Sequence, residues 1–217
     1  MKLSFGGHEL MMHASGVLYW PDREMLIVSD LHLEKGSSFA RRGFFLPPYD
    51  SDETLRRLLA VCATLAPKRL VLLGDSFHDE QGYQRLSQDA INLFSELYRF
   101  DPVWVVGNHD GAFVPGGFEV HRDFVVDGLT FRHEAEEDGQ FEISGHYHPK
   151  ADIIHKGARV SVRCFVENGQ RLVMPSFGAY TGGLAVSHPS IRALFPQGHT
   201  LHVLSSTRVI SLKGLDT

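Results

Sequence analysis

Met25-Leu26-Ile27-Val28-Ser29-Asp30-Leu31-His32 contains the pattern that decides the fold, an apolar run that ends at a polar motif. The run Met25–Val28 is rich in residues that favour β-structure and is short enough for a buried strand. We predict five such strands, each carrying a carboxylate, an amide or a histidine just past its end. The other four predicted strands cover residues 70–73, 103–106, 129–131 and 141–143.

Two helices are predicted between these strands. Apolar residues follow helical spacing over residues 51–66, where acidic side chains fill the first turn and Pro67 stands just past the end. The same spacing recurs over residues 87–99. Strands and helices that alternate in this way indicate βαβ units. Because ligands gather at the carboxyl ends of the strands in such sheets, we expect the polar motifs to meet there.

The pattern changes after residue 150, where short strands follow one another with turns between them. Asn168-Gly169 is typical of a hairpin turn. We expect these strands to form a second sheet packed against the first, so that residues 1–217 make a single α/β domain. The strands expected here cover residues 159–166, 171–174, 200–204 and 208–212.

The composition excludes several classes of protein. The 217 residues are 43% hydrophobic, which is ample for a core, but no run resembles a membrane span and the N-terminus lacks the apolar segment of a signal peptide. Cys62 and Cys164 are too few for a disulfide framework, so we expect a cytoplasmic protein. The net charge of −5 gives no support to broad binding of nucleic acid.

The charge is distributed unevenly along the chain. Residues 1–149 carry a net charge of −10, whereas residues 150–217 carry +5. Two interpretations are open. The acidity of the first part can belong to metal ligands and turns, or the basic last third can attract an anionic substrate.

Five polar blocks supply seven candidate metal ligands, all carboxylate, amide oxygen or imidazole and none a thiolate. This set suits two ions such as Mn²⁺, Fe²⁺ or Zn²⁺, and two ions about 3.5–4 Å apart are typical of displacement at phosphorus. Asp75 follows Gly74, which permits a sharp turn, and its carboxylate has lone pairs enough to bridge both ions. The candidate ligands are Asp30, His32, Asp75, Asn108, His133, His146 and His148.

The ordered blocks resemble the calcineurin-like metallophosphoesterase superfamily, whose pattern is D-x-H, G-D, G-N-H-D/E, H and G-H-x-H. The match runs from Asp30 to His148. The resemblance implies a four-layer αββα sandwich with two mixed sheets flanked by helices. It also implies two metal sites that share Asp75. One site would use Asp30, His32, Asp75 and His148, and the other would use Asp75, Asn108, His133 and His146.

A closer resemblance spans almost the whole chain. Six segments are similar to the ligase-associated DNA damage response endonucleases, a bacterial subfamily encoded beside an ATP-dependent DNA ligase, a helicase and an exonuclease. The resemblance implies Mn²⁺-dependent phosphodiester cleavage with single-stranded DNA as a substrate. The segments are Leu18-Tyr19-Trp20-Pro21, residues 30–36, Ala40-Arg41-Arg42-Gly43, Pro47-Pro48-Tyr49-Asp50, residues 74–79 and residues 175–183.

The expected mechanism is in-line attack by a hydroxide that the two metals generate from a bridging water. His109 adjoins the ligand Asn108 and is the candidate general acid for the leaving sugar oxygen. Asp110 is expected to orient the His109 ring and to favour its protonated form. His78 has two open roles, either contact with the phosphate and leaving group or support of a ligand.

Several basic residues lie a few positions from the motifs. Arg41, Arg42 and Lys150 are candidates for contact with flanking phosphates, with solvated surface charge as the alternative. Tyr147 can line the site or pack in the core. Tyr180 can stack on a base, or its glycine-flanked segment can be a turn or a subunit contact.

Two further functions compete with a DNA phosphodiesterase. The same ligands serve a phosphomonoesterase or a hydrolase of nucleotides and nucleotide-linked metabolites. A protein-binding scaffold is disfavoured because all seven ligands and His109 are present. A homodimer is expected only because symmetric dimers are the commonest assemblies.

Overall fold

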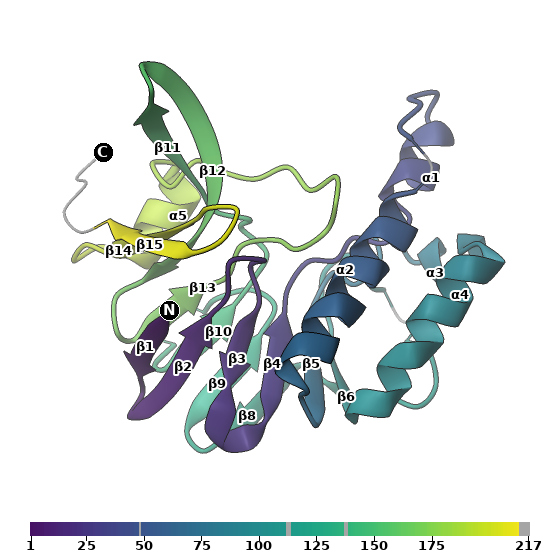
Figure 1. Ribbon diagram of the computed structural model, residues 1–217, viewed down its shortest axis with the longest axis horizontal. Helices are drawn as coiled ribbons and strands as arrows, with labels where there is room; N and C mark the ends of the chain where they lie inside the picture. The colour runs from purple at the N-terminus through teal and green to yellow at the C-terminus, as the bar shows by residue number, and fades with distance from the viewer. Residues whose placement is uncertain (48, 112–113, 137–138, 213–217) are drawn as a thin grey trace.

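The computed structural model describes residues 1–47, 49–111, 114–136 and 139–212; Pro48, from one of the family-like segments, lies outside them. Two mixed β-sheets pack face to face, and helices cover their outer faces (Figure 1). The predicted α/β class and αββα layering are confirmed. No helix among the described residues is long and apolar enough to cross a membrane.

The first sheet contains the predicted βαβ units. Strands β4 (Met25–Val28), β5 (Arg69–Leu73), β6 (Pro102–Val105) and β7 (Glu119–His121) are parallel. Helix α2 (Asp50–Leu65) joins β4 to β5, and α4 (Gln88–Ser95) lies between β5 and β6. The sequence did not predict β7 or the antiparallel strands that extend the other edge. These are β1 (Lys2–Phe5), β2 (His8–Met12) and β3 (Leu18–Trp20).

The second sheet begins earlier in the chain than predicted. Two of the five motif strands, β9 (Leu129–Arg132) and β10 (Glu142–Ser144), belong to it and pair in parallel. The hairpin at Asn168-Gly169 is confirmed, since Val166 pairs with Val173 in antiparallel register. The remaining strands are β8 (Asp123–Val126), β12 (Ala158–Glu167), β13 (Arg171–Val173), β14 (Thr200–Leu204) and β15 (Val209–Leu212).

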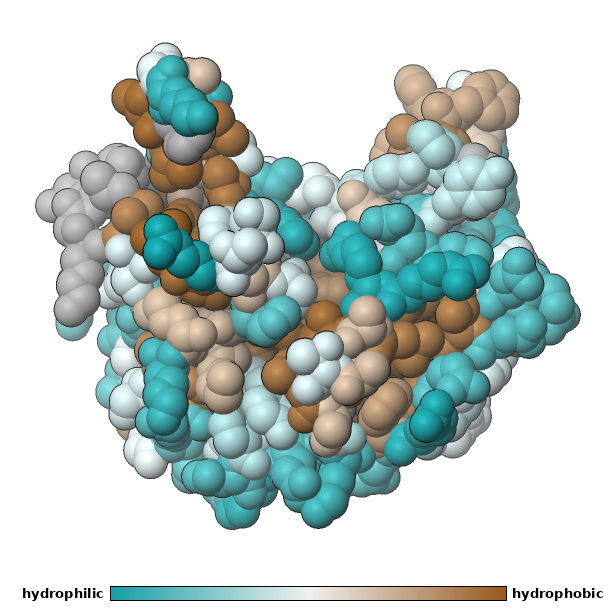
Figure 2. Space-filling model, viewed as in Figure 1, coloured by the Kyte–Doolittle hydropathy of each residue, from teal (hydrophilic) through white to brown (hydrophobic). Residues whose placement is uncertain are grey.

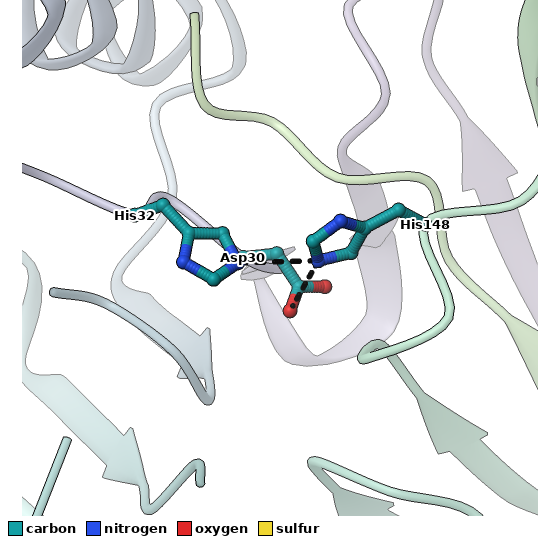
Figure 3. Close-up of side chains that lie close together, drawn as sticks. All are labelled: Asp30, His32 and His148. Atoms are coloured by element: carbon teal, nitrogen blue, oxygen red, sulfur yellow. Dashed lines mark hydrogen bonds and ion pairs between the residues drawn. The ribbon is translucent and has the colours of Figure 1, made fainter. Parts of the chain in front are cut away.

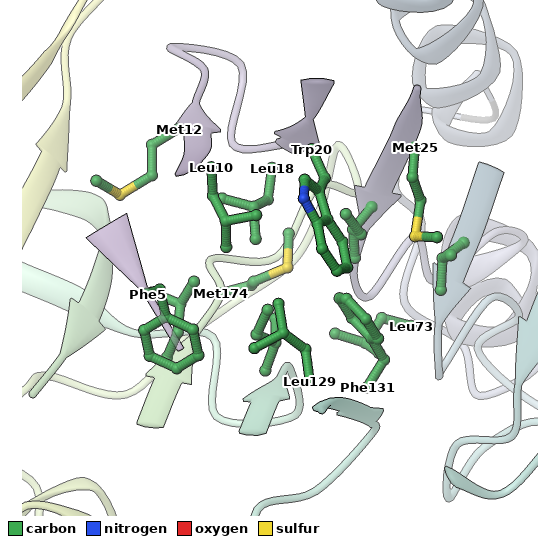
Figure 4. Close-up of a cluster of buried hydrophobic side chains, with 14 of the residues drawn as sticks. Phe5, Leu10, Met12, Leu18, Trp20, Met25, Leu73, Leu129, Phe131 and Met174 are labelled. Carbon is green, nitrogen blue, oxygen red and sulfur yellow. The ribbon is translucent and has the colours of Figure 1, made fainter. Parts of the chain in front are cut away.

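The principal core lies between the two sheets (Figure 4). Trp20 of the first sheet and Phe131 of the second are fully buried, with ring centroids 6.4 Å apart. A second cluster lies between the first sheet and the helices, where Phe94 of α4 faces Phe77 at 5.8 Å. Burial of one large apolar side chain contributes about 1.5–3 kcal/mol, so these two layers fix how the strand ends are placed.

The helices differ from the predictions in their ends. Ser87 caps α4 by accepting a hydrogen bond of 3.1 Å from the Ala90 amide, and the last turn of the predicted helix is the 3₁₀ segment Glu96–Phe100. On the second sheet, α5 (Pro189–Leu194) covers the outer face. Two short helices were not predicted, α1 (Lys35–Ala40) and α3 (Gly82–Arg85).

Two projections rise from the edge of the sandwich (Figure 1). One is the hairpin of β11 (Lys150–His155) with β12, and the other carries α1 and the loop that follows it. The space-filling view is hollowed between them (Figure 2). The metal-ligand candidates lie on the loops past the carboxyl ends of the strands at this edge.

Candidate metal centre

The first two motifs lie side by side because the parallel pairing of β4 and β5 continues beyond both strands. The His32 amide donates a hydrogen bond of 2.9 Å to the Asp75 carbonyl, and the Leu33 amide donates one of 2.9 Å to Ser76. The His78 amide then donates to the Leu33 carbonyl at 2.9 Å. These bonds bring the side chains of Asp30 and His32 next to Asp75.

The second sheet brings its histidines to the same place. The Gly145 amide donates a hydrogen bond of 2.9 Å to the His133 carbonyl, which extends the pairing of β9 and β10. The His146 amide donates to Asp30 Oδ2 at 3.1 Å and so joins the two sheets across the centre. All seven predicted ligands therefore come together, four from the first sheet and three from the second.

Asp30, His32 and His148 form one ligand group (Figure 3). His148 Nε2 lies 3.1 Å from Asp30 Oδ1 and 3.2 Å from His32 Nε2. The donor atoms lie within 4.8 Å of one another, and Asp30 and His32 are buried. These are three of the four residues expected for the first metal, the fourth being Asp75.

Asp75, His133 and His146 form the second group. Asp75 Oδ2 lies 3.4 Å from His133 Nε2, and His146 Nδ1 lies 3.1 Å from the same nitrogen. The Asn108 amide group is 3.4 Å from His146 Nδ1. Asp75 Oδ2 is also 3.7 Å from His32 Nε2 in the first group. Asp75 thus stands between the two groups, as a bridging ligand would.

The backbone at this centre is strained and closely packed. Asp30, His32, Asp75, His146 and His148 all have φ between 43° and 67°, a left-handed conformation that costs a non-glycine residue about 1–2 kcal/mol. Gly145 has no room for a side chain, because a Cβ there would collide with Ser29 Oγ and Asp30 Oδ2. Such strain persists only where the surroundings over-determine the conformation, which is common at functional sites.

The electrostatics of this centre suit bound cations. Burial lowers the pKa of His32 to about 3, so its ring is a neutral imidazole. Burial opposes the charge on Asp75, but its hydrogen bond and charge interaction with His133 hold the pKa of this carboxyl well below its ordinary value. Despite its own burial, His133 has a pKa raised to about 9 by Asp75 and Asp30. The carboxylates thus already attract positive charge, here a proton on His133 that a bound metal ion would displace, and the donor set fits two divalent ions.

The His109 side chain lies half-exposed beside this centre. Its side chain is 49% exposed, and its Nε2 lies 3.9 Å from Asp75 Oδ2. His78 stacks on the His109 ring with centroids 5.4 Å apart and an interplanar angle of 15°, and its Nδ1 lies 3.4 Å from His32 Nδ1. His78 therefore contacts both a ligand and the candidate acid.

Asp110 has partners other than the His109 ring. Its Oδ1 accepts from the amides of Ser76 and Phe77 at 2.9 and 3.3 Å. Its Oδ2 accepts from the Gly107 amide at 2.8 Å and from Trp104 Nε1 at 3.2 Å. Burial raises the pKa of Asp110 to about 6, although the amide hydrogen bonds oppose the shift. The carboxylate holds together the loops that carry Asp75 and Asn108.

The three basic residues predicted to contact phosphate lie in different settings. Arg41 and Arg42 are exposed, and Arg41 Nη1 donates to Gln81 Oε1 at 2.6 Å. Lys150 begins β11 and is close enough to Lys35 to lower its pKa, after the larger effect of burial. Tyr147 is buried in the cluster outside the second sheet, and its ring meets that of His146 edge-on at 5.0 Å.

Several supporting residues were not identified from sequence. Arg57 donates a hydrogen bond of 2.7 Å to the Phe177 carbonyl and lies 4.6 Å over its ring. The Phe177 amide in turn donates to the Ser29 carbonyl at 2.9 Å, which fixes the loop before Asp30. Glu34 bonds Ser51 Oγ through both its amide and its carboxylate at 2.8 Å. The sequence could have indicated these residues only by their position, either within the family-like segments or on the adjoining helix.

Comparisons with known proteins agree with this geometry. The sequence model of the calcineurin-like phosphoesterases matches residues 24–178, from the start of β4 to the loop beyond β13. The structure is similar to Pseudomonas putida nuclease MPE, with a TM-score of 0.74 and 23% identity over 98% of this chain and 99% of that one.

A weaker likeness is to YfcE, a phosphoesterase from E. coli, with a TM-score of 0.44 and 15% identity over 87% of this chain and 97% of that one. No curated protein sequence matches the chain. The family match covers more than half of the chain and includes every predicted ligand. The chain therefore belongs to the calcineurin-like phosphoesterase family and is a metal-dependent phosphoesterase.

Proposed function

We propose that this protein is a manganese-dependent phosphodiesterase that cuts single-stranded DNA internally. The position of Asp75 between two candidate ligand groups is the observation that carries phosphoester chemistry. The choice of DNA is supported by the sequence resemblance to the ligase-associated endonucleases and by the nuclease named as the structural neighbour.

The residues of the chain have distinct roles in this proposal. Two divalent ions held by the two groups would neutralise phosphate oxygens and lower the pKa of a water molecule. His109 donates a proton to the leaving sugar oxygen and regains one from solvent, which its half-exposed ring can reach. His78 stacks on that ring and limits its rotation. Asp110 keeps the His109 loop aligned with Asp75.

Nicking of circular single-stranded DNA with added Mn²⁺ tests the proposal. A circle has no ends, so only an endonuclease converts it to a linear product. We expect linear DNA from the wild type and an intact circle from Asp75→Asn. An intact circle from wild-type protein that holds two metals would reject DNA cleavage and would favour phosphomonoesters or nucleotides as substrates.

The cellular setting is also proposed. We infer a role in DNA repair in the bacterial cytoplasm, alongside a DNA ligase, a helicase and an exonuclease, from the same sequence resemblance. The two cysteines, Cys62 and Cys164, are buried free thiols, which accords with a reducing compartment.

A further inference from the structure

Four large apolar side chains are exposed together between α1 and α2. Phe45 is 87% exposed, Tyr49 69%, Phe44 66% and Leu46 36%. They lie at the end of the projection that carries α1, where the space-filling view shows a hydrophobic tip (Figure 2). Contiguous exposed apolar groups of this kind mark a binding surface more often than chance.

Hydrogen bonds hold this loop in a defined turn. The amides of Arg42 and Phe44 donate to the Phe39 carbonyl at 2.9 and 3.0 Å, and Gly43 donates to Ala40 at 3.0 Å. Gly43 has a φ of +84°, which a residue with a side chain rarely adopts. Phe39 and Phe44 meet edge-on with centroids 6.5 Å apart. The turn therefore fixes the position of Phe44, next to Phe45 in the chain.

A line of rings connects the loop with the catalytic centre. The Phe39 ring lies 5.7 Å from that of His78, and His78 stacks on His109 at 5.4 Å. His109 is the proposed proton donor to the leaving group. A substrate that leaves the centre on this side passes His78 and Phe39 before it reaches Phe44.

Positive charge accompanies the aromatic groups. Arg41 and Arg42 line a cavity of about 440 Å³ together with Ser38, Asp79, Glu80 and Gln81. Two ion-pair contacts of 2.8 Å from Arg85 neutralise Asp79 in this cavity. Lys35 Nζ lies 5.8 Å over the Phe39 ring. Cations that follow a backbone, beside rings on which bases stack, are typical of surfaces that bind single strands.

We propose that Phe44, Phe45 and Tyr49 form a stacking platform for the unpaired bases of the DNA substrate. Arg41 and Arg42 bind the phosphates that link those bases. This inference rests on the proposed function and deepens it. Bases within a duplex are stacked on one another and cannot reach the platform. The loop is then the part of the protein that selects a single strand.

Substitutions at Phe45 distinguish stacking of a base on an aromatic ring from a general hydrophobic contact with DNA. Phe45→Ala and Phe45→Leu should each raise the KM for single-stranded DNA by about tenfold to hundredfold, since one stacked base contributes that much. Phe45→Tyr should have a KM for DNA close to that of the wild type, because tyrosine keeps the aromatic ring. Hydrolysis of bis(p-nitrophenyl) phosphate should stay unchanged in all three, because this small ester does not reach the loop. Val125→Ala, at a 61% exposed apolar site on β8, is the matched control.

Two kinetic outcomes would overturn the platform. If Phe45→Leu binds DNA as well as the wild type, the surface is simply apolar. If none of the variants changes the KM for DNA, the loop does not touch the strand. A wild-type protein that hydrolyses the ester but cuts no DNA would reject the proposed function instead, and DNA binding itself then decides the platform.

Phe45→Trp reports that binding directly. The native Trp20 and Trp104 are both fully buried, so only the new indole is open to a ligand. Stopped-flow mixing of metal-loaded protein with oligothymidylate should quench the fluorescence, whereas an abasic oligonucleotide of equal length should not. Equal effects of the two, or a blue shift with phosphatidylglycerol vesicles and no response to oligothymidylate, would overturn the proposal.

Discussion

The backbone amide of His109 donates a hydrogen bond of 2.9 Å to Oδ1 of Asp75. The second oxygen of the same carboxylate lies between the two ligand groups. The candidate proton donor is thus attached to the residue best placed to bridge both metals. Binding of metal and placement of the acid are therefore linked through one side chain.

Replacement of Asp75 tests that link. Asp75→Asn removes the charge shared by the two groups but keeps the size of the side chain, so we expect fewer than two metals per protein and loss of turnover by at least about 100-fold. Metal content by mass spectrometry and hydrolysis of bis(p-nitrophenyl) phosphate give the two readouts. Asp89→Asn, on the exposed face of α4, should change neither. Full metal content in Asp75→Asn would contradict the bridging role.

The His109→Ala variant should distinguish proton donation from metal binding. We expect normal metal content and a loss of about 10²–10⁴ in DNA cleavage, the usual contribution of a general acid. The rate of bis(p-nitrophenyl) phosphate hydrolysis should fall far less, because nitrophenolate is a good leaving group without protonation. Rates on both substrates check this. Equal losses on the two would mean that His109 acts on the centre as a whole.

Asp110→Asn should mainly affect stability. The carboxylate accepts from three backbone amides and an indole, and an amide side chain would turn an N–H group toward some of these donors. We expect the free energy of unfolding to fall by about 1–3 kcal/mol. Urea denaturation measures this. An unchanged urea midpoint would show that the loops keep their structure without the Asp110 carboxylate.

Gly145→Ala should disturb the centre without changing any ligand. The added methyl group would collide with Ser29 and Asp30, and overpacking of this kind costs about 1–3 kcal/mol. Thermal unfolding and metal content should both fall. Gly116→Ala is the matched control, since nothing lies within 4 Å of a Cβ at that position. If Gly145→Ala keeps full metal content, the close approach is not needed.

The Asp79–Arg85 pair should contribute a pH-dependent part of the stability. Burial opposes the charge on Asp79, but hydrogen bonds from Arg85 and Ser38 lower its pKa to about 2, from 3.8. The contribution is therefore present above pH 3.8 and is lost as the pH falls toward 2.

The stability difference between wild type and Asp79→Asn checks that sign. Both side chains are partly exposed, so we expect only about 0.5–1 kcal/mol at pH 6. The difference should shrink as the pH is lowered below 4. A constant difference across that range would mean that packing, rather than charge, is responsible.

Local patterns predicted the parts of the fold that are buried on both faces. The run Met25–Val28 is completely buried in β4 and was easily recognised. Strand β7 has two exposed residues out of three, and β1 has one fully buried residue out of four, so neither has an apolar run to detect. The division of the motif strands between two sheets depends on pairing partners far apart in sequence, such as Ser144 with Val173.

The sequence predicted the candidate metal ligands but not the residues that hold the surrounding loops in place. His146 and Asp30 could be assigned to one centre because their motifs have recognisable spacing. The role of Asp110 could not, since its partners Ser76 and Phe77 lie more than 30 residues away. Likewise, nothing in the sequence around Arg57 indicates that it holds Phe177, 120 residues further on.

The strand order of the second sheet determines when the centre can form during synthesis. Strand β13 pairs directly with β10, and β12 and β14 follow beside it. The ribosome therefore releases His133, His146 and His148 before it has made the strands that hold them in place. Since a site of this kind rarely exists in an unfolded chain, stable metal capture waits until β12, β13 and β14 have been made. Cellular metals can therefore compete for the centre only after the second sheet has folded.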